Sequence, residues 1–395
     1  MKLIVLPAVL AIAQAALGQP GPKTVLEETP GFIATRAGRY LVVELRSPHR
    51  VLSTSAGTGG QSDAMRYLVN HQSMEPAGDM ERHDKIVALS EEQYHDLVSR
   101  ELGLNPAQVA VMGTAANMNY LSHRHIEFRD LRVDAFVTAG VEANATRPGD
   151  PANWYEGEKG MEYIRPNNGT INTILIVNQP LTAAAQARAV VTMTEAKTAA
   201  LMELAVPSHY STHMATGTST DQYIVASPLN ASRAPLKWTG PDTKLGEIIG
   251  TAVREATEEA LRWQNGLEAS YTRSITHALS RFGLTETELL KRLRELLSEK
   301  SYKLFTDNQS GVTMEPRLAA AAFAYAAVLD RLQYGTLPQE LAEEILRDQA
   351  ATTATAISLK VGDWPTFWGQ IPTKPGDRLE PFVRGLALGW QARWE

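Results

Sequence analysis

Short runs of apolar and β-branched residues predict buried β-strands. Residues 40–45 and 51–55 are the first two runs, and the turn-forming pair Ser47-Pro48 separates them. Later runs of the same character cover residues 108–112, 134–138, 172–177 and 222–227. We expect each run to form a strand inside a sheet.

Apolar positions at helical spacing predict helices between and after these strands. Residues 90–102 open with Ser90 and Gln93, the pair that forms a capping box. Residues 182–204 are alanine-rich, and residues 244–264 repeat apolar positions at helical spacing. Because strands and helices alternate, we expect an α/β or α+β fold in which a mixed sheet packs with helices.

The pattern changes near residue 265, beyond which strand-like runs are few. Thr285 and Glu288 give a second capping-box pattern, and residues 319–332 are alanine-rich. The chain therefore predicts a main domain over residues 40–264 and a helical accessory domain over residues 265–395. Trp364, Phe367 and Trp368 would form a dimerisation or partner surface if they are exposed, and a core if they are buried. A homo-oligomer is thus one expectation.

The first residues resemble a secretory signal. Lys2 precedes a mostly apolar run over residues 3–17, which is shorter than the about 20 residues of a membrane span. We expect a signal peptide over residues 1–18, a linker or N-terminal extension over residues 19–39, and export to a bacterial periplasm or the extracellular space. We expect no stable membrane span after removal of the signal. If this segment is not a working signal, the protein is cytoplasmic.

Composition excludes several classes of function. The chain has 38 basic and 44 acidic residues and a net charge of −6, which argues against binding to nucleic acid or to anionic lipid by charge. It has no cysteine, so disulfides, thiol nucleophiles and cysteine-ligated metal clusters are excluded. The nine histidines include His123-x-His125 and His209-x-x-x-His213, but neither pair lies in a known metal motif. We therefore expect no metal site.

Four segments gather small and polar residues beside the predicted strands. Gly59 and Gly60 would let backbone N–H groups approach an anion, or form a plain turn. Asn144 follows a strand and would bind an amide, or cap the chain. Lys197 has apolar neighbours on its helix, so it works in a site or extends to solvent. Asp221 could be a general base, bind a cation or cap a turn.

These segments, with two later ones, keep the order and spacing of one enzyme family. They are Val137-Thr138-Ala139-Gly140-Val141 through Asn144, Gly169-Thr170-Ile171-Asn172-Thr173, Thr194-Glu195-Ala196-Lys197-Thr198-Ala199-Ala200, Gly217-Thr218-Ser219-Thr220-Asp221, Lys237-Trp238-Thr239-Gly240 and Lys244-Leu245-Gly246. Over about residues 40–262 the chain resembles the adenosylcobinamide amidohydrolase (CbiZ) family. The signal-like start and the region after residue 265 lie outside the family's pattern.

The resemblance implies hydrolysis of the amide that joins aminopropanol to the corrin ring, with adenosylcobyric acid and 1-amino-2-propanol as products, in corrinoid salvage. The corrinoid would be the substrate, so no cofactor is expected. An exported corrinoid-binding protein without hydrolase activity, and an enzyme for another amide, are the alternatives.

For this chemistry we assign Asp221 to water activation and Lys197 or Glu195 to proton transfer. Asn144, with backbone groups near Gly59 and Gly60 or near Gly217, would face the oxyanion. The expected substrate-binding residues are Gly59, Gly60, Thr138, Thr170, Asn172, Gly217, Thr218 and Thr220. Trp154, Tyr155 and Trp238 are candidates for the walls of a corrin pocket, or for the core.

Overall fold

A computed structural model describes residues 22–55, 57–73, 80–158, 160–163, 169–229 and 233–394. The expected signal peptide lies outside these residues. The chain divides into two compact units. The first contains residues 1–203 and 215–266, and the second contains residues 204–214 and 267–395.

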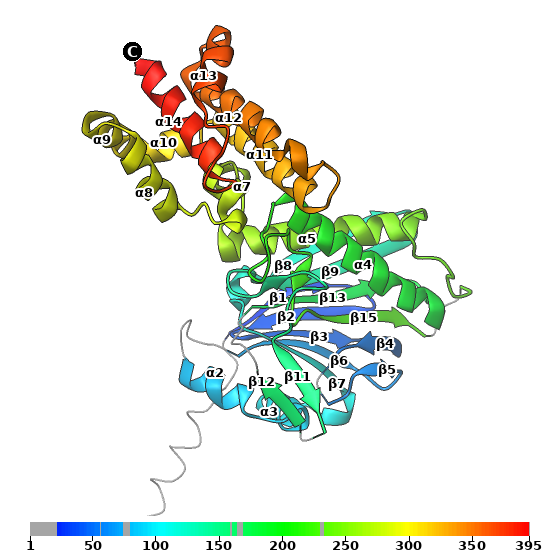
Figure 1. The fold of residues 1–395 in the computed structure, drawn as a ribbon. Coiled ribbons are helices and arrows are strands. Elements are labelled where there is room, and N and C mark those ends of the chain that lie inside the picture. The colour runs from blue at the N-terminus through cyan, green and yellow to red at the C-terminus, as the bar shows by residue number, and fades with distance from the viewer. Residues whose placement is uncertain are drawn as a thin grey trace, which may run out of the picture. The chain divides into compact units, whose positions relative to one another are not determined.

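Two β-sheets form the centre of the first unit (Figure 1). The five-stranded sheet contains, in spatial order, Lys23–Glu28 (β1), Phe32–Ala37 (β2), Tyr40–Leu45 (β3), Tyr67–Gln72 (β6) and Val109–Thr114 (β7). The six-stranded sheet contains Gly60–Ser62 (β5), His49–Ser53 (β4), Gln222–Pro228 (β15), Ile171–Val177 (β13), Leu131–Ala139 (β9) and Ser122–Phe128 (β8). Each sheet is mixed, because β6 and β7 are parallel, as are β13 and β15, whereas the other pairs are antiparallel.

The inner faces of the two sheets share one hydrophobic core. Phe32 and Leu41 of the five-stranded sheet belong to the same buried cluster as Phe136, Ile174 and Ile224 of the six-stranded sheet. Side chains alternate between the faces of a strand, so this core fixes which residues point inward.

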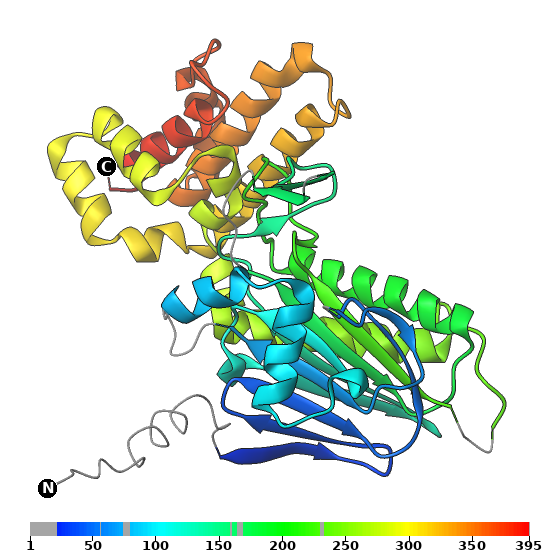
Figure 2. The same cartoon turned by 90° about the horizontal axis from the view of Figure 1, so that it is seen from below.

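Helices cover the outer faces (Figure 2). Ala183–Glu203 (α4) and Lys244–Asn265 (α5) pack on the six-stranded sheet, and Glu91–Glu101 (α3) packs on the five-stranded sheet. The unit thus has four layers, helix–sheet–sheet–helix. The predicted mixture of strands and packed helices is confirmed, including the Ser90–Gln93 capping box.

Smaller elements complete the unit. Ala145–Thr146 (β10) pairs with Gly217–Thr218 (β14), and Trp154–Gly157 (β11) pairs with Gly160–Tyr163 (β12). Met80–Val87 (α2) precedes α3.

One prediction about the N-terminal part is wrong. Residues 19–39 were expected to form a linker or extension, but they contain strands β1 and β2. Strand β1 pairs with β2, and Phe32 and Ala34 of β2 are buried in the core. The polar residues of β1 conceal the strand in sequence, because it is an edge strand with little buried surface.

The second unit is helical, as expected. Its helices are Ala269–Thr272 (α6), Ile275–Leu279 (α7), Glu286–Leu296 (α8), Glu299–Asp307 (α9), Gln309–Thr313 (α10), Pro316–Gln333 (α11), Ala342–Ser358 (α12), Trp364–Gln370 (α13) and Glu380–Trp394 (α14). Gly385 and Gly389 let α14 approach α12, since an added Cβ would lie 2.2 Å from the carbonyl oxygen of Ala350 and 2.3 Å from that of Ala354.

The aromatic residues of α13 pack inside this unit. Phe367 is buried, and Trp364 and Trp368 are half-buried against the same apolar cluster. This arrangement favours a core role for the three residues over an exposed stripe. None of the helices in the described ranges combines the length and apolarity needed to cross a bilayer.

Candidate functional site

A lysine–aspartate pair marks the candidate site. Lys197 lies on α4, and Asp221 immediately precedes β15. The Lys197 Nζ donates a hydrogen bond to Asp221 Oδ2, and the side chains are 13% and 20% exposed. A largely desolvated ion pair interacts more strongly than one on the surface. The Lys197–Asp221 pair is largely desolvated but keeps some access to solvent. Lys197 therefore does not extend freely into solvent.

The other carboxylate oxygen of Asp221, Oδ1, accepts hydrogen bonds from Thr218 and Ile171. Oδ1 accepts hydrogen bonds from Thr218 Oγ1 at 2.6 Å, from the Thr218 N–H at 3.1 Å and from the Ile171 N–H at 3.1 Å. Because Oδ1 is fully occupied, any chemistry of this carboxylate must take place at Oδ2.

Gly217 allows the ion pair to form. A Cβ at this position would lie 2.3 Å from Asp221 Oδ2 and 2.6 Å from Lys197 Nζ. These separations are below van der Waals contact, so any side chain would displace the pair. The sequence prediction that Gly217 belongs to the site thus has a steric basis.

Asn144 fixes the loop that carries Asp221. Its Nδ2 donates to the Gly169 carbonyl at 2.8 Å and to Thr220 Oγ1 at 3.3 Å, and its Oδ1 accepts from Ser219 Oγ at 2.8 Å. Asn144 is completely buried, whereas Ser219 and Thr220 are exposed. Asn144 consequently positions the two hydroxyls and has no surface of its own to offer a substrate.

A chain of buried amides and hydroxyls connects this loop to the opposite sheet. Thr170 Oγ1 lies 2.6 Å from the Thr220 carbonyl oxygen and 3.2 Å from Asn172 Oδ1. Asn172 Nδ2 donates to Asn70 Oδ1 at 2.9 Å, and Asn70 Nδ2 donates to Thr138 Oγ1 at 2.8 Å. Buried polar groups are costly unless they are paired, so this network fixes the register of the two sheets.

Asn70 was missed by sequence reasoning. It lies on β6, a strand whose NHQ end looks polar although residues 68–72 are buried. The strand has the apolar residues Leu68 and Val69 near its start and continues with polar ones. This change from apolar to polar residues could have indicated a strand whose polar end is buried.

Not all of the predicted residues join this network. Gly60 lies in β5, and the loop before it bonds to β7 through Ser55 and Thr58. In the described residues no contact brings Gly59 or Gly60 to the Lys197–Asp221 pair. Glu195 is exposed on α4 and makes none of the network's hydrogen bonds. It lies two residues from Lys197, so the helix directs it to another side.

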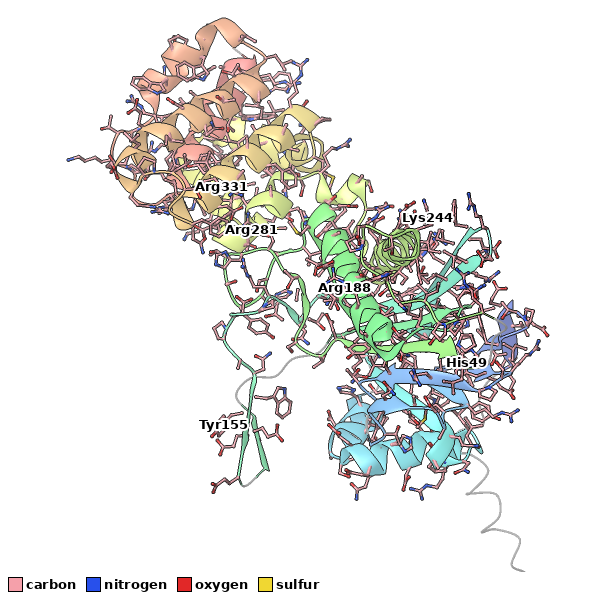
Figure 3. All side chains as sticks on the ribbon, turned by 90° about the vertical axis from the view of Figure 1, so that its right-hand side faces the viewer. His49, Tyr155, Arg188, Lys244, Arg281 and Arg331 are labelled. Carbon is pink, nitrogen blue, oxygen red and sulfur yellow. The ribbon has the colours of Figure 1, made fainter. Side chains whose placement is uncertain are left out.

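The aromatic candidates are exposed. Trp154 is 37%, Tyr155 59% and Trp238 74% exposed. Figure 3 labels Tyr155 on the β11–β12 hairpin, which extends away from the sheets. Exposure of this size argues against a core role for Tyr155 and Trp238.

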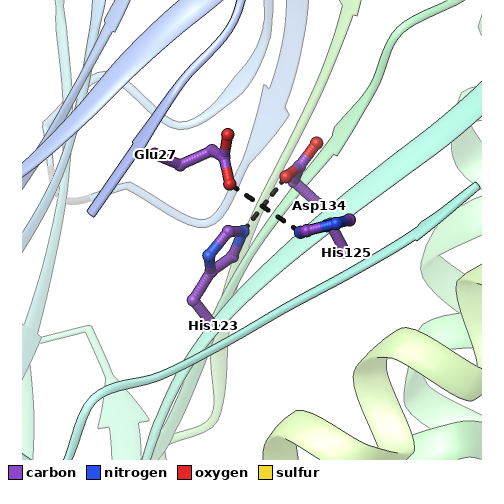
Figure 4. Close-up of side chains that lie close together, drawn as sticks. All are labelled: Glu27, His123, His125 and Asp134. Atoms are coloured by element: carbon purple, nitrogen blue, oxygen red, sulfur yellow. Dashed lines mark hydrogen bonds and ion pairs between the residues drawn. The ribbon is translucent and has the colours of Figure 1, made fainter. Parts of the chain in front are cut away.

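A second polar cluster lies at the other end of β9. His123 and His125 of β8 approach Asp134 of β9 and Glu27 of β1 (Figure 4). Burial by itself would raise the pKa of Asp134, but hydrogen bonds from Arg132 and His123 outweigh burial and hold the pKa below its ordinary value. Sequence reasoning found the shared face of the two histidines but could not find their acidic partners. Glu27 is distant in sequence, and the position of Asp134 depends on the register between β8 and β9.

Comparisons with known proteins agree with the motif pattern. A family model described as adenosylcobinamide amidohydrolase matches residues 26–269. An uncharacterized protein of Methanocaldococcus jannaschii is 34% identical over 239 residues, which cover 58% of this chain and 88% of that protein. An adenosylcobinamide amidohydrolase of Methanosarcina mazei is 30% identical over 179 residues, which cover 44% of this chain and 75% of that protein.

The matches among solved structures have low sequence identity. A Burkholderia β-aminopeptidase matches with a TM-score of 0.29 and 14% identity, covering 62% of this chain and 88% of that chain. An L-aminopeptidase D-Ala-esterase/amidase from Ochrobactrum anthropi matches with a TM-score of 0.25 and 13% identity, covering 62% of this chain and 87% of that chain. The family match begins at residue 26, so the second half of β1 and all of β2 lie within the matched region.

Proposed function

Because this chain belongs to the adenosylcobinamide amidohydrolase family, we propose that it hydrolyses the amide between aminopropanol and the corrin ring of adenosylcobinamide. The products are adenosylcobyric acid and 1-amino-2-propanol, and the reaction serves corrinoid salvage. The observation that carries the proposal is the Lys197–Asp221 pair, held beside exposed hydroxyls by a fully bonded loop.

The pair supplies both proton transfers that amide hydrolysis needs. Asp221 Oδ2 takes a proton from a water molecule while the water oxygen attacks the amide carbon. The C–N bond of the tetrahedral intermediate then breaks, and Lys197 Nζ gives a proton to the departing amine. A proton passes from Asp221 to Lys197 along their shared hydrogen bond, and the starting state is restored.

The negative charge that develops on the carbonyl oxygen needs fixed donors. Ser219 and Thr220 carry exposed hydroxyls on the loop that precedes Asp221. Their hydrogens point to Asn144 Oδ1 and to the Gly169 carbonyl, so each hydroxyl would turn its hydrogen to the oxyanion when substrate binds. Asn144 holds both hydroxyls, so its role is to position these donors. This assignment replaces the expectation that Asn144 itself faces the oxyanion, because its side chain is buried and its amide groups are occupied.

The test is incubation of the purified protein with adenosylcobinamide, followed by mass spectrometry for the free carboxylate and 1-amino-2-propanol. We expect product from the unmodified protein and a loss of about 10²–10⁴-fold for Asp221→Asn and Lys197→Met. The matched control is Glu203→Gln, which changes an exposed acid on the same helix. Undiminished turnover in Asp221→Asn would remove the assigned base.

The same assay separates hydrolysis from binding alone. A corrinoid-binding protein without activity would retain adenosylcobinamide on a desalting column and release no aminopropanol. That outcome would contradict the proposed reaction while leaving the corrinoid specificity intact.

We also propose that the protein is exported, on the strength of the apolar run over residues 3–17. N-terminal sequencing of protein from a fractionated host should find the mature chain outside the cytoplasm. Recovery of the full-length chain in the cytoplasm would contradict export.

A further inference from the structure

Four side chains able to bind a metal ion come together at one edge of the sandwich. One ligand atom each from Glu27, His123, His125 and Asp134 lies within 4.8 Å of the other three (Figure 4). His123 Nε2 is 3.0 Å from Asp134 Oδ1, and His125 Nδ1 is 3.7 Å from Glu27 Oε2. In a tetrahedral zinc site, with bonds of about 2.0–2.1 Å, neighbouring ligand atoms are about 3.4 Å apart. Shifts of about 1 Å would therefore complete a coordination shell.

The strands themselves bring the four residues together. His123 and His125 alternate along β8 and so share a face. Asp134 is paired with His125 in the β8–β9 ladder. Glu27 lies at a shift of register in β1, a β-bulge of the kind that redirects a side chain. The residues thus come from three strands of two sheets.

The surroundings fit a metal site. The ring of His123 stacks on Phe136 at 4.1 Å, which fixes its orientation. Asp134 is 2% exposed, whereas the side chain of His125 is 49% exposed, so the cluster has a buried end and an open end. A cavity of about 340 Å³ also borders Asp134. An ion would have a route to the cluster.

Arg132 is the resident cation beside the cluster. Its Nε lies 2.8 Å from Asp134 Oδ2, and its Nη2 lies 2.8 Å from Asp134 Oδ1 and 3.3 Å from Glu27 Oε1. Its Nη1 also donates to Glu127 at 2.9 Å, which gives the guanidinium a carboxylate partner outside the cluster. Glu27 Oε2 faces His125 and is not the oxygen that contacts Arg132. Arg132 would compete with a metal ion by charge, without filling the histidine side.

We infer that Glu27, His123, His125 and Asp134 bind one Zn²⁺ ion. Two imidazole nitrogens and two carboxylate oxygens suit zinc, and four protein ligands with no open position are typical of a structural site. Asp134 lies four residues from Thr138 on β9, a separation of about 13 Å along the strand, so the ion has no part in the proposed amide chemistry. It ties the edge strand β1 to β8 and β9.

The test titrates tag-free protein with Zn²⁺ alone, in competition with a chromophoric chelator. We expect one ion per chain, and a rise of at least about 5 °C in the thermal unfolding midpoint when free zinc is 100-fold above its dissociation constant. His125→Gln and Glu27→Gln should each weaken binding at least tenfold, an effect of about the size seen when outer-shell partners are lost. These positions are partly exposed, so both variants should fold. The matched control is His209→Gln, which changes an exposed histidine in the second unit.

Arg132→Gln provides an independent arm, because removal of the competing charge should tighten binding by about tenfold. Four-coordinate Co²⁺ in place of zinc should give visible d–d bands that His125→Gln weakens. The inference is overturned if zinc does not bind stoichiometrically, if His125→Gln and Glu27→Gln keep the wild-type affinity, or if Arg132→Gln abolishes binding. None of these readouts depends on amidase activity.

Discussion

Each end of strand β9 buries a polar side chain, but the two side chains have different kinds of partner. Thr138 and Asp134 are both buried polar residues on the inner face of the sandwich. Thr138 closes a chain of neutral amides and hydroxyls through Asn70, whereas Asp134 is surrounded by the charges of Arg132 and by His123. Neutral groups can be buried at low cost when each is paired, but buried charges need partners of opposite sign.

The chemistry available at each end follows from this difference. The neutral amides and hydroxyls near Thr138 fix the loop before Asp221 without adding charge. The Lys197–Asp221 pair beside this loop carries charge and can exchange protons. At the charged end, near Asp134, a metal ion can compete with the Arg132 guanidinium for the carboxylates.

The largest effect concerns the ion pair as a unit. Lys197→Met and Asp221→Asn should each reduce turnover by about 10²–10⁴-fold. The double variant should lose little more than the worse single variant, because the two residues act together. Steady-state rates with adenosylcobinamide measure this coupling, and zinc affinity should stay unchanged in all three variants. Additive losses would show that the residues act separately.

The next effect concerns the neutral chain. Asn172→Ala should lower the free energy of unfolding by about 2–4 kcal/mol, since Asn70 and the Gly113 carbonyl lose a buried donor. Urea unfolding measures the change, with Asn119→Ala at an exposed position as the control. A loss equal to that of the control would show that the chain does not stabilise the fold.

Gly217→Ala should reduce turnover by at least about tenfold, because the new methyl group would overlap the ion pair. Gly250→Ala is the matched control on α5, where an added Cβ meets nothing within 4 Å. That control should be neutral or stabilise by up to about 1 kcal/mol. Rates and urea midpoints of both variants test the steric argument, which fails if Gly217→Ala retains full activity.

A smaller effect concerns His49, a buried histidine near the charged end. Burial lowers its pKa, although its hydrogen bond to the Ser47 carbonyl opposes this shift. Below a pH of about 6.5 the unfolded chain gains a proton that the folded chain does not, so the free energy of unfolding should fall as the pH falls through this range. His49→Gln should flatten this dependence in urea titrations at several pH values. An unaltered slope would contradict the assignment.

The smallest effect is expected at Glu195. Its side chain is exposed and lies outside the network, so Glu195→Gln should change turnover by less than about twofold. A large loss would restore Glu195 as a proton donor and would extend the active end of the sheet along α4.

Strands β3, β4, β7, β9, β13 and β15 and helices α3, α4 and α5 could be predicted from the sequence because their signals are local. The predicted strand over residues 40–45 coincides with β3, and the predicted helix over residues 244–264 differs from α5 by one residue. Strands β1 and β8 escaped prediction because polar residues fill edge strands, whose faces are partly exposed.

The residues of the candidate site could be named from the sequence, because the lysine, the aspartate, the hydroxyls and the glycine all lie in short motifs that keep a family's order and spacing. Which of these residues meet depends on how the chain folds. The tertiary structure paired Lys197 with Asp221, left Glu195 in solvent, and brought Glu27 to two histidines about a hundred residues away. The physical reason is that contacts between strands and helices depend on register and on the inner or outer face of each element, which distant parts of the chain fix together.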